Sequence, residues 1–258
     1  PRGALYVLGR SGLAVADADD FALVATLPEG VADDARFDTL GERWLVTSAA
    51  AWVSDDHGAQ WTQRLGAPRD PGAFDHVSPR DAFATARLVA AAHVGPAVLA
   101  LDGTHALWRS DDLGGAWERL GTSLTVTAER AMLTPTVLAW DGARRIAVFR
   151  AGEALVSTDA GSSFHTIAAP FVVRDAAFVD DALVALGGVS HLLPPRCRTT
   201  PGSALLVHTR EGWIADAEAC DHLGVAYTRD GDALWLVDEA ATLHRTSLRD
   251  FVRRTAPR

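Results

Sequence analysis

The sequence predicts an all-β fold, and three observations carry this prediction. A short phrase, Ser-x-Asp-x-Gly-x-x-aromatic, occurs at residues 54–61, 110–117 and 157–164. Each copy lies between a short apolar run and a polar, strand-like stretch, which is typical of a hairpin turn. The apolar runs recur in repeats of roughly 40 to 50 residues, the length of a four-stranded propeller blade. No helical period persists long enough for a helical domain, so we expect a β-propeller.

The residue types of the repeated phrase define a tight turn. An Asp at the start of a loop accepts hydrogen bonds from backbone N–H groups two or three residues later, and a Gly supplies positive φ. The Ser hydroxyl closes the other side, and the aromatic side chain packs against the sheet. Because none of this requires a substrate, these positions are predicted to be structural: Ser54, Asp56, Gly58, Trp61, Ser110, Asp112, Gly114, Trp117, Ser157, Asp159, Gly161 and Phe164.

The three phrases resemble the Asp-box, or BNR repeat, of sialidases, the sortilin family, some glycoside hydrolases and photosystem II assembly factors. All four fixed positions match in each copy, and the central Asp residues are 56 and 47 residues apart. The resemblance implies a β-propeller with each box at the turn between the third and fourth strands of a blade. In that family the boxes lie on the face opposite the usual binding sites, and they imply no particular activity.

Six four-stranded blades are predicted in one domain of residues 1–258, with five or seven as alternatives. The first blade has three expected strands, at 4–8, 13–16 and 21–26, and its innermost strand is missing or precedes Pro1. The fourth blade has expected strands at 137–140, 146–150 and 153–156. The last two blades have lost the phrase, but each keeps an aromatic residue near the expected spacing, Trp213 and Phe251. The approximate blade bounds are 1–30, 31–66, 67–121, 122–169, 170–219 and 220–258.

Composition excludes several functional classes. A net charge of −9 argues against sequence-independent nucleic-acid binding, which needs a basic field. No apolar stretch approaches the ~20 residues of a membrane-spanning helix. All 24 basic residues are Arg, which together with heavy Ala, Gly, Asp and Val usage suggests a GC-rich bacterial genome. The nine His show no pair at metal-ligand spacing and there is no Cys-x-x-Cys, so no metal or cofactor is expected.

Recognition is expected on the face that carries the blade connections and the turns between second and third strands. Two long loops lie there, at 66–80 and 187–202, and long loops on a rigid scaffold commonly carry binding. The binding-face candidates are Arg69, His76, Arg80, His191, Arg196 and Arg198. Surface padding is the alternative interpretation of both loops.

The two cysteines give an indication of the cellular compartment in which the protein works. The expected topology places Cys197 and Cys220 on one face, where a disulfide would pin the long loop and imply an oxidising compartment. Two free thiols in a cytoplasmic protein are the alternative. The chain begins at Pro1 and its one Met is Met132. Since Asp-box propellers are usually exported, we expect an extracytoplasmic protein whose N-terminal signal segment has been removed.

Two functions remain open from sequence. The first is a non-catalytic propeller that binds a protein or a glycan, or serves as a subunit of a bacterial envelope or surface complex. The alternative is a sialidase-like glycoside hydrolase, which the resemblance would equip with Tyr227 as nucleophile and with Arg229 and Arg145 as carboxylate-binding arginines. The sequence departs from sialidases because Arg145 follows two boxes and Tyr227 has no evident Glu partner. The same fold hosts many functions, so the non-catalytic role is preferred.

Overall fold

In the computed structural model, most of the described residues lie in β-strands. The described residues are 5–9, 12–17, 20–28, 31, 35–66, 87–124, 136–150, 152–169, 173–187, 204–209, 212–215, 226–230, 232–237 and 243–255. Contacts divide the chain into two compact units, Pro1–Ala128 and Glu129–Arg258. Each unit is considered by itself below.

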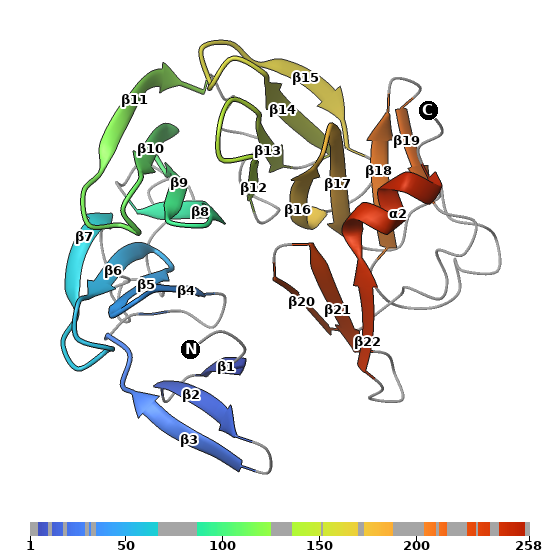
Figure 1. The fold of residues 1–258 in the computed structure, drawn as a ribbon. Helices are drawn as coiled ribbons and strands as arrows, with labels where there is room; N and C mark the ends of the chain where they lie inside the picture. The colour runs from blue at the N-terminus through green and yellow to red at the C-terminus, as the bar shows by residue number, and fades with distance from the viewer. Residues whose placement is uncertain are drawn as a thin grey trace, which may run out of the picture. The chain divides into compact units, whose positions relative to one another are not determined.

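The first unit contains three antiparallel sheets in which each strand pairs with its neighbour in sequence (Figure 1). The first sheet is β1 (Leu5–Gly9), β2 (Gly12–Asp17) and β3 (Asp20–Ala25). The second is β4 (Arg36–Leu40), β5 (Arg43–Thr47), β6 (Ala50–Ser54) and β7 (Thr62–Gly66). The third is β8 (Leu88–Val94), β9 (Ala97–Asp102), β10 (Ala106–Ser110) and β11 (Glu118–Ser123).

The second unit repeats this plan with two four-stranded sheets and one three-stranded sheet. The fourth sheet is β12 (Val137–Trp140), β13 (Ile146–Arg150), β14 (Glu153–Ser157) and β15 (His165–Ala168). The fifth is β16 (Val173–Val179), β17 (Ala182–Gly187), β18 (Ala204–Thr209) and β19 (Gly212–Ala215). The sixth is β20 (Ala226–Asp230), β21 (Ala233–Val237) and β22 (Leu243–Ser247).

The sheets pack face to face within each unit. Between the second and third sheets, Leu45 and Val53 lie in one buried cluster with Val98 and Leu113. Between the fourth and fifth sheets, a second cluster holds Phe149 of β13, with residues of β16 and β17 on its other side. Outer strands such as β7 are largely exposed whereas middle strands such as β13 are fully buried, because a strand inside the stack is covered on both faces.

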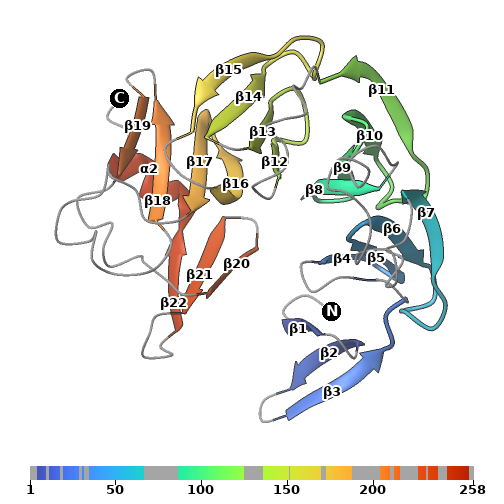
Figure 2. The ribbon, with the colours of Figure 1, turned by 180° about the vertical axis from the view of Figure 1, so that it is seen from behind.

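A helix follows the last described strand, where the sequence led us to expect a remnant of the repeated turn that keeps only its aromatic residue, Phe251. Helix α2 (Leu248–Thr255) follows β22 directly, and Figures 1 and 2 show it beside β17. The backbone N–H of Asp250 donates to Ser247 Oγ at 3.1 Å, so Ser247 caps the helix. The side chains of Leu248 and Phe251 are buried against the fifth sheet. The expected remnant of the repeated turn around Phe251 is therefore wrong, because these residues form a capped amphipathic helix that buries its apolar side chains.

The predicted all-β class is confirmed, and several strands begin and end where the sequence placed them. The strands predicted at 137–140 and 146–150 coincide with β12 and β13. The first sheet has the three strands expected for 1–30. Six antiparallel sheets form among the described residues, while the blade count of the whole protein and its single-domain character stay predictions.

Candidate functional site

The three Ser-x-Asp-x-Gly segments form the same hydrogen-bonded turn, at 54–61 after β6, 110–117 after β10 and 157–164 after β14; we refer to them as the Ser-Asp-Gly turns. In each turn the serine hydroxyl donates to the aspartate Oδ1 and accepts from the glycine N–H, and Oδ1 also accepts the backbone N–H four residues beyond the aspartate. The serine to aspartate distances are 2.7, 2.8 and 2.8 Å. The glycine to serine distances are 2.7, 2.8 and 2.8 Å. The last bond comes from Gln60, Ala116 and Ser163, each at 2.9 Å.

Each turn also bonds to the first hairpin turn of its own sheet. The residue after the aspartate has positive φ, namely His57, Leu113 and Ala160. Its N–H donates to a carbonyl oxygen of the turn between the sheet's first two strands, Glu42, Pro96 or Arg144. Both turns therefore lie at one end of the sheet, which we call the turn end. The hairpin that joins the second and third strands lies at the opposite end, since successive antiparallel strands reverse direction.

The glycines of the first two turns, Gly58 and Gly114, allow close packing on the preceding sheet. Gly58 has φ +85° and Gly114 has φ +81°, which glycine adopts at little cost. A Cβ at Gly114 would lie 2.9 Å from Leu45 Cδ1 and 3.0 Å from Val53 Cγ2, both in the preceding sheet. These positions therefore need glycine for backbone conformation and for space.

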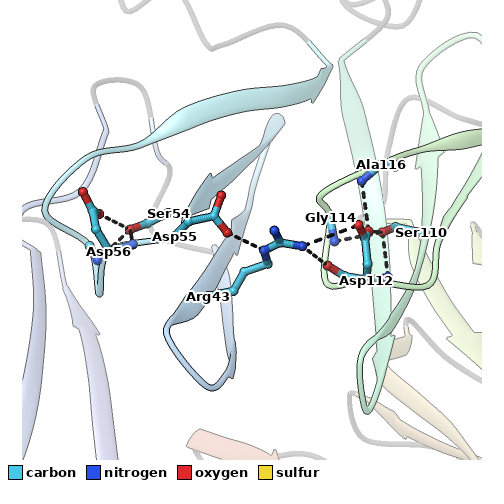
Figure 3. Close-up of polar contacts among 9 residues, drawn as sticks. Arg43, Ser54, Asp55, Asp56, Ser110, Asp112, Gly114 and Ala116 are labelled. Atoms are coloured by element: carbon cyan, nitrogen blue, oxygen red, sulfur yellow. Dashed lines mark hydrogen bonds and ion pairs between the residues drawn. The ribbon is translucent and has the colours of Figure 1, made fainter.

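Arg43 connects two of the turns across neighbouring sheets (Figure 3). Its Nε donates to Asp55 Oδ1 at 2.5 Å, and its Nη1 donates to the Asp112 carbonyl oxygen at 2.9 Å. The Nη1 atom also lies 3.5 Å from Asp112 Oδ2. The pKa of Asp112 is lowered by the hydrogen bond from the Ala116 N–H, then by the Ser110 hydroxyl and by the charge of Arg43, against an opposing effect of burial. The Asp112 carboxylate is thus committed to the turn.

The carboxylate of Asp159 is held most strongly. Ser163 donates to it twice, from its hydroxyl to Oδ2 at 2.7 Å and from its N–H to Oδ1 at 2.9 Å. These bonds, followed by that from Ser157, lower the pKa of Asp159 to about 2. Asp56 also has a lowered pKa, chiefly because the Ser54 hydroxyl donates to it. A carboxylate that accepts this many donors is stabilised as an anion and is poorly suited to proton transfer.

Two tryptophans each fasten a sheet to the one before it. The indole Nε1 of Trp61 donates to the Thr26 carbonyl oxygen at 2.9 Å, and Thr26 directly follows β3. Trp213, in the fifth sheet, makes the same bond to the Ala168 carbonyl oxygen at 2.7 Å. Trp213 also contacts Phe149 at a centroid distance of 6.0 Å. The aromatic function therefore persists in a sheet that has lost the serine and the aspartate.

Arg145, a candidate of the alternative enzyme hypothesis, lies at the turn end of the fourth sheet. Its Nε donates to Asp141 Oδ2 at 2.7 Å. Its Nη1 lies 3.5 Å from Asp181 Oδ1, and its guanidinium carbon lies 5.0 Å from the Phe178 ring centroid. Arg145 thus joins the fourth and fifth sheets through contacts that a substrate carboxylate would have to displace.

Arg150, at the end of β13, was not singled out from sequence. It lies at the opposite end of the fourth sheet, beside the hairpin to β14, and its side chain is only 6% exposed. Among the described residues, its buried Nε and Nη2 atoms have no hydrogen-bond partner. Burial lowers the pKa of Arg150, and the nearby charge of Glu153 acts in the other direction. Strand alternation could have revealed it, because it shares a strand face with Ile146 and Val148.

A partly buried polar cluster also lies between the second and third sheets. His93 Nε2 is 3.2 Å from Thr47 Oγ1, and His93 Nδ1 is 3.5 Å from Asp38 Oδ2. This is the order of groups in a nucleophile–base–acid relay. Thr47 is only 4% exposed, and the cluster ties the second and third sheets together. These residues are far apart in sequence, so no local pattern could have joined them.

The structure does not describe the side chains of the remaining predicted site residues. Tyr227 and Arg229 lie on β20, described by its backbone alone. The candidates Arg69, His76, Arg80, His191, Arg196 and Arg198 fall outside the described residues, as do Cys197 and Cys220. Their roles stay predictions. Within the described ranges, no group of three or more His, Cys, Asp or Glu side chains is placed to hold a metal ion. No helix in those ranges is long and apolar enough to cross a membrane.

Comparisons with known proteins indicate the fold of this chain but assign it to no protein family. No protein-family model matches the chain, and no curated protein matches it. Among solved structures, YCF48 bound to D1 peptide is 13% identical, with a TM-score of 0.52 over 96% of this chain and 75% of that chain. BBS1N in complex with ARL6DN is 12% identical, with a TM-score of 0.52 over 95% of this chain and 74% of that chain.

An enzyme is also among the similar structures. The GH74 xyloglucanase from Xanthomonas campestris is 16% identical, with a TM-score of 0.52 over 100% of this chain and 43% of that chain. At such identities the likeness concerns architecture and carries no activity to this chain. These structures are β-propellers, and four of the sheets described above have the four antiparallel strands of a propeller blade. The chain therefore has a β-propeller fold.

Proposed function

We propose that this protein is a non-catalytic β-propeller that binds another protein at the opposite end of its sheets, where the second and third strands of each sheet join. We further propose that the Ser-Asp-Gly turns are Asp-boxes with a purely structural role. The protein would work outside the cytoplasm as a subunit of a bacterial envelope or surface complex, where a Cys197–Cys220 disulfide would be stable.

The observation that carries this proposal is the contrast between the two ends of the fourth sheet. At the turn end, Asp159 is saturated by Ser157 and Ser163, and Arg145 is paired with Asp141. At the opposite end, Arg150 keeps two N–H groups without partners among the described residues. Internal bonds stabilise the fold, whereas an unpaired buried cation costs stability, which is common where a protein binds something else.

The similar structures support a binding role in general terms. One is named for a bound D1 peptide and another for its complex with ARL6DN. Propellers of this architecture thus present surfaces that other polypeptides recognise. The xyloglucanase shows that the architecture also hosts hydrolysis, so catalysis has to be tested directly.

Site-specific photocrosslinking tests which end of the sheets is used. A photoreactive amino acid replaces Gly152 at the opposite end or, as the matched control, Gly41 at the turn end. Both glycines have positive φ, and a Cβ at either would meet no atom within 4 Å, so the two substitutions perturb the fold similarly. Crosslinking in the native envelope fraction should give a discrete protein adduct from position 152 and none from position 41. A discrete adduct from position 41 alone would overturn the choice of end.

Enzyme assays test the non-catalytic part. A fluorogenic sialoside and a panel of glycosides are incubated with the wild-type protein and with Tyr227→Phe. The proposal expects no turnover above that of the heat-denatured protein. Turnover that Tyr227→Phe abolishes would establish the sialidase-like alternative instead.

A further inference from the structure

Most neighbours of Arg150 on its own strand face are apolar and buried. Side chains alternate along β13, so Ala147 and Phe149 face the cluster shared with the fifth sheet while Arg150 lies on the other face with Ile146 and Val148. Ile146 is 1% exposed and Val148 is fully buried. A guanidinium beside such residues has lost most of its hydration, which is costly unless it gains a partner.

The two unpaired atoms of Arg150 form one recognition edge. In a planar guanidinium, the N–H of Nε and one N–H of Nη2 point in the same direction and are spaced to match the two oxygens of a carboxylate. These are the two buried nitrogens of Arg150 without hydrogen-bond partners among the described residues. A bidentate acceptor would satisfy both together.

The nearby charge limits the kind of anion. Glu153 pairs with Arg150 in the strand register across the β13–β14 hairpin and contributes a negative charge near the guanidinium. A dianionic phosphate would be repelled by that carboxylate more strongly than a singly charged ligand. The apolar neighbours on the same strand face also disfavour a sugar acid, whose hydroxyl groups would lose water without finding donors or acceptors.

We propose that Arg150 is the anchor of a binding site for a carboxylate of an acidic polypeptide segment, held through the Nε–Nη2 edge at the opposite end of the fourth sheet. This inference rests on the proposed protein-binding function and names the chemistry of its partner. The carboxylate belongs either to an Asp or Glu side chain or to the C-terminus of the partner chain.

A peptide array distinguishes these sources. Random dodecapeptides are presented with a free C-terminal carboxylate, with an amidated C-terminus, or amidated with Asp and Glu replaced by Asn and Gln. The wild-type protein should bind a subset of carboxylate-bearing peptides and none of the fully neutral set. Arg150→Gln should weaken that binding at least about tenfold, and so should Arg150→Lys, which keeps the charge but lacks the fork. Arg144→Gln, an exposed arginine at the turn end of the same sheet, is the matched control and should leave binding unchanged.

A second measurement needs no ligand. If Arg150 has no internal partner, Arg150→Met should raise the urea midpoint of the free protein while it abolishes peptide binding. A lower midpoint would mean that Arg150 is a structural partner and would overturn the inference. Equal peptide binding by wild type and Arg150→Gln would also overturn it, but would leave the proposed function standing. Binding of sialosides with no binding of any peptide would overturn both.

Discussion

Replacement of Gly114 by alanine probes how the Ser-Asp-Gly turns hold neighbouring sheets together. Gly114 has φ +81°, and its missing side chain faces Leu45 and Val53 of the preceding sheet. Leu45 is fully buried and Val53 is 2% exposed, so neither side chain can move aside into solvent. The substitution therefore adds a backbone penalty and a packing penalty at one position.

The two penalties have different sizes. An alanine in the left-handed region costs about 1 kcal/mol relative to glycine. A Cβ at 2.9 Å from Leu45 Cδ1 and 3.0 Å from Val53 Cγ2 overpacks a closed core, which typically costs about 1–3 kcal/mol more. The total for Gly114→Ala is about 2–4 kcal/mol, a large share of the stability of an ordinary domain.

Gly95→Ala is the control that isolates the packing penalty. Gly95 has φ +58° and lies in the β8–β9 turn of the same sheet, and a Cβ at this position would meet no atom within 4 Å. Urea unfolding followed by tryptophan fluorescence should show Gly95→Ala shifted by about 1 kcal/mol and Gly114→Ala by a further 1–3 kcal/mol, with unchanged m-values. Equal shifts for both variants would refute the idea that the turn glycine is a contact between sheets.

Three further predictions address the contacts around the turns and the fifth sheet. Burial, and then the charge of His165, lower the pKa of His208; the unfolded chain therefore takes up a proton first as pH falls, and stability should decline below about pH 6.5 in wild type. His208→Phe should remove much of this decline in urea midpoints measured between pH 5 and 8, and an unchanged profile would contradict the assignment. Ser163→Ala should raise the pKa of Asp159 from about 2 in a carboxyl NMR titration but leave it below its ordinary value, since the other donors remain; an unshifted titration would show that Ser163 is not the main donor. Trp61→Phe should cost about 1 kcal/mol more than Trp117→Phe, because the Trp61 indole has a carbonyl partner and the buried Trp117 Nε1 has none among the described residues; equal urea midpoints would count against the bond to Thr26.

The turns could be predicted from sequence because their chemistry is local. The serine, aspartate and glycine of each turn lie within five residues, and every bond among them involves side chains with a known preference for turns. The short apolar runs likewise placed β12 and β13 correctly. Even Trp213 could be recognised by its spacing, although its bond to Ala168 could not.

Long-range contacts explain most of what the sequence did not predict. Arg43 and Asp112 are 69 residues apart, and nothing near either residue indicates the other. The cluster of Asp38, Thr47 and His93 has the same origin, since it forms only when two sheets stack. Such pairs depend on sheet packing, which periodicity alone does not determine.

Helix α2 was missed for a different reason. Ser247 and Asp250 are spaced as a helix cap and first turn, and Leu248, Phe251 and Val252 follow helical spacing, so the signal was present. Comparison with the earlier turns favoured another turn of the same kind around Phe251. A local helix signal eight residues long therefore competed with an expected repeat, and the helix signal was the correct one.

Hydrogen–deuterium exchange tests most directly whether one end of the sheets binds the partner while the other end is structural. Exchange is measured on the free protein and on its complex with the tightest-binding array peptide. We predict that the peptide slows exchange at residues 150–153, around Arg150 and the β13–β14 hairpin. The Ser-Asp-Gly turns at 54–61, 110–117 and 157–164 should exchange equally in both samples. Protection of those turns with no change at 150–153 would contradict the account.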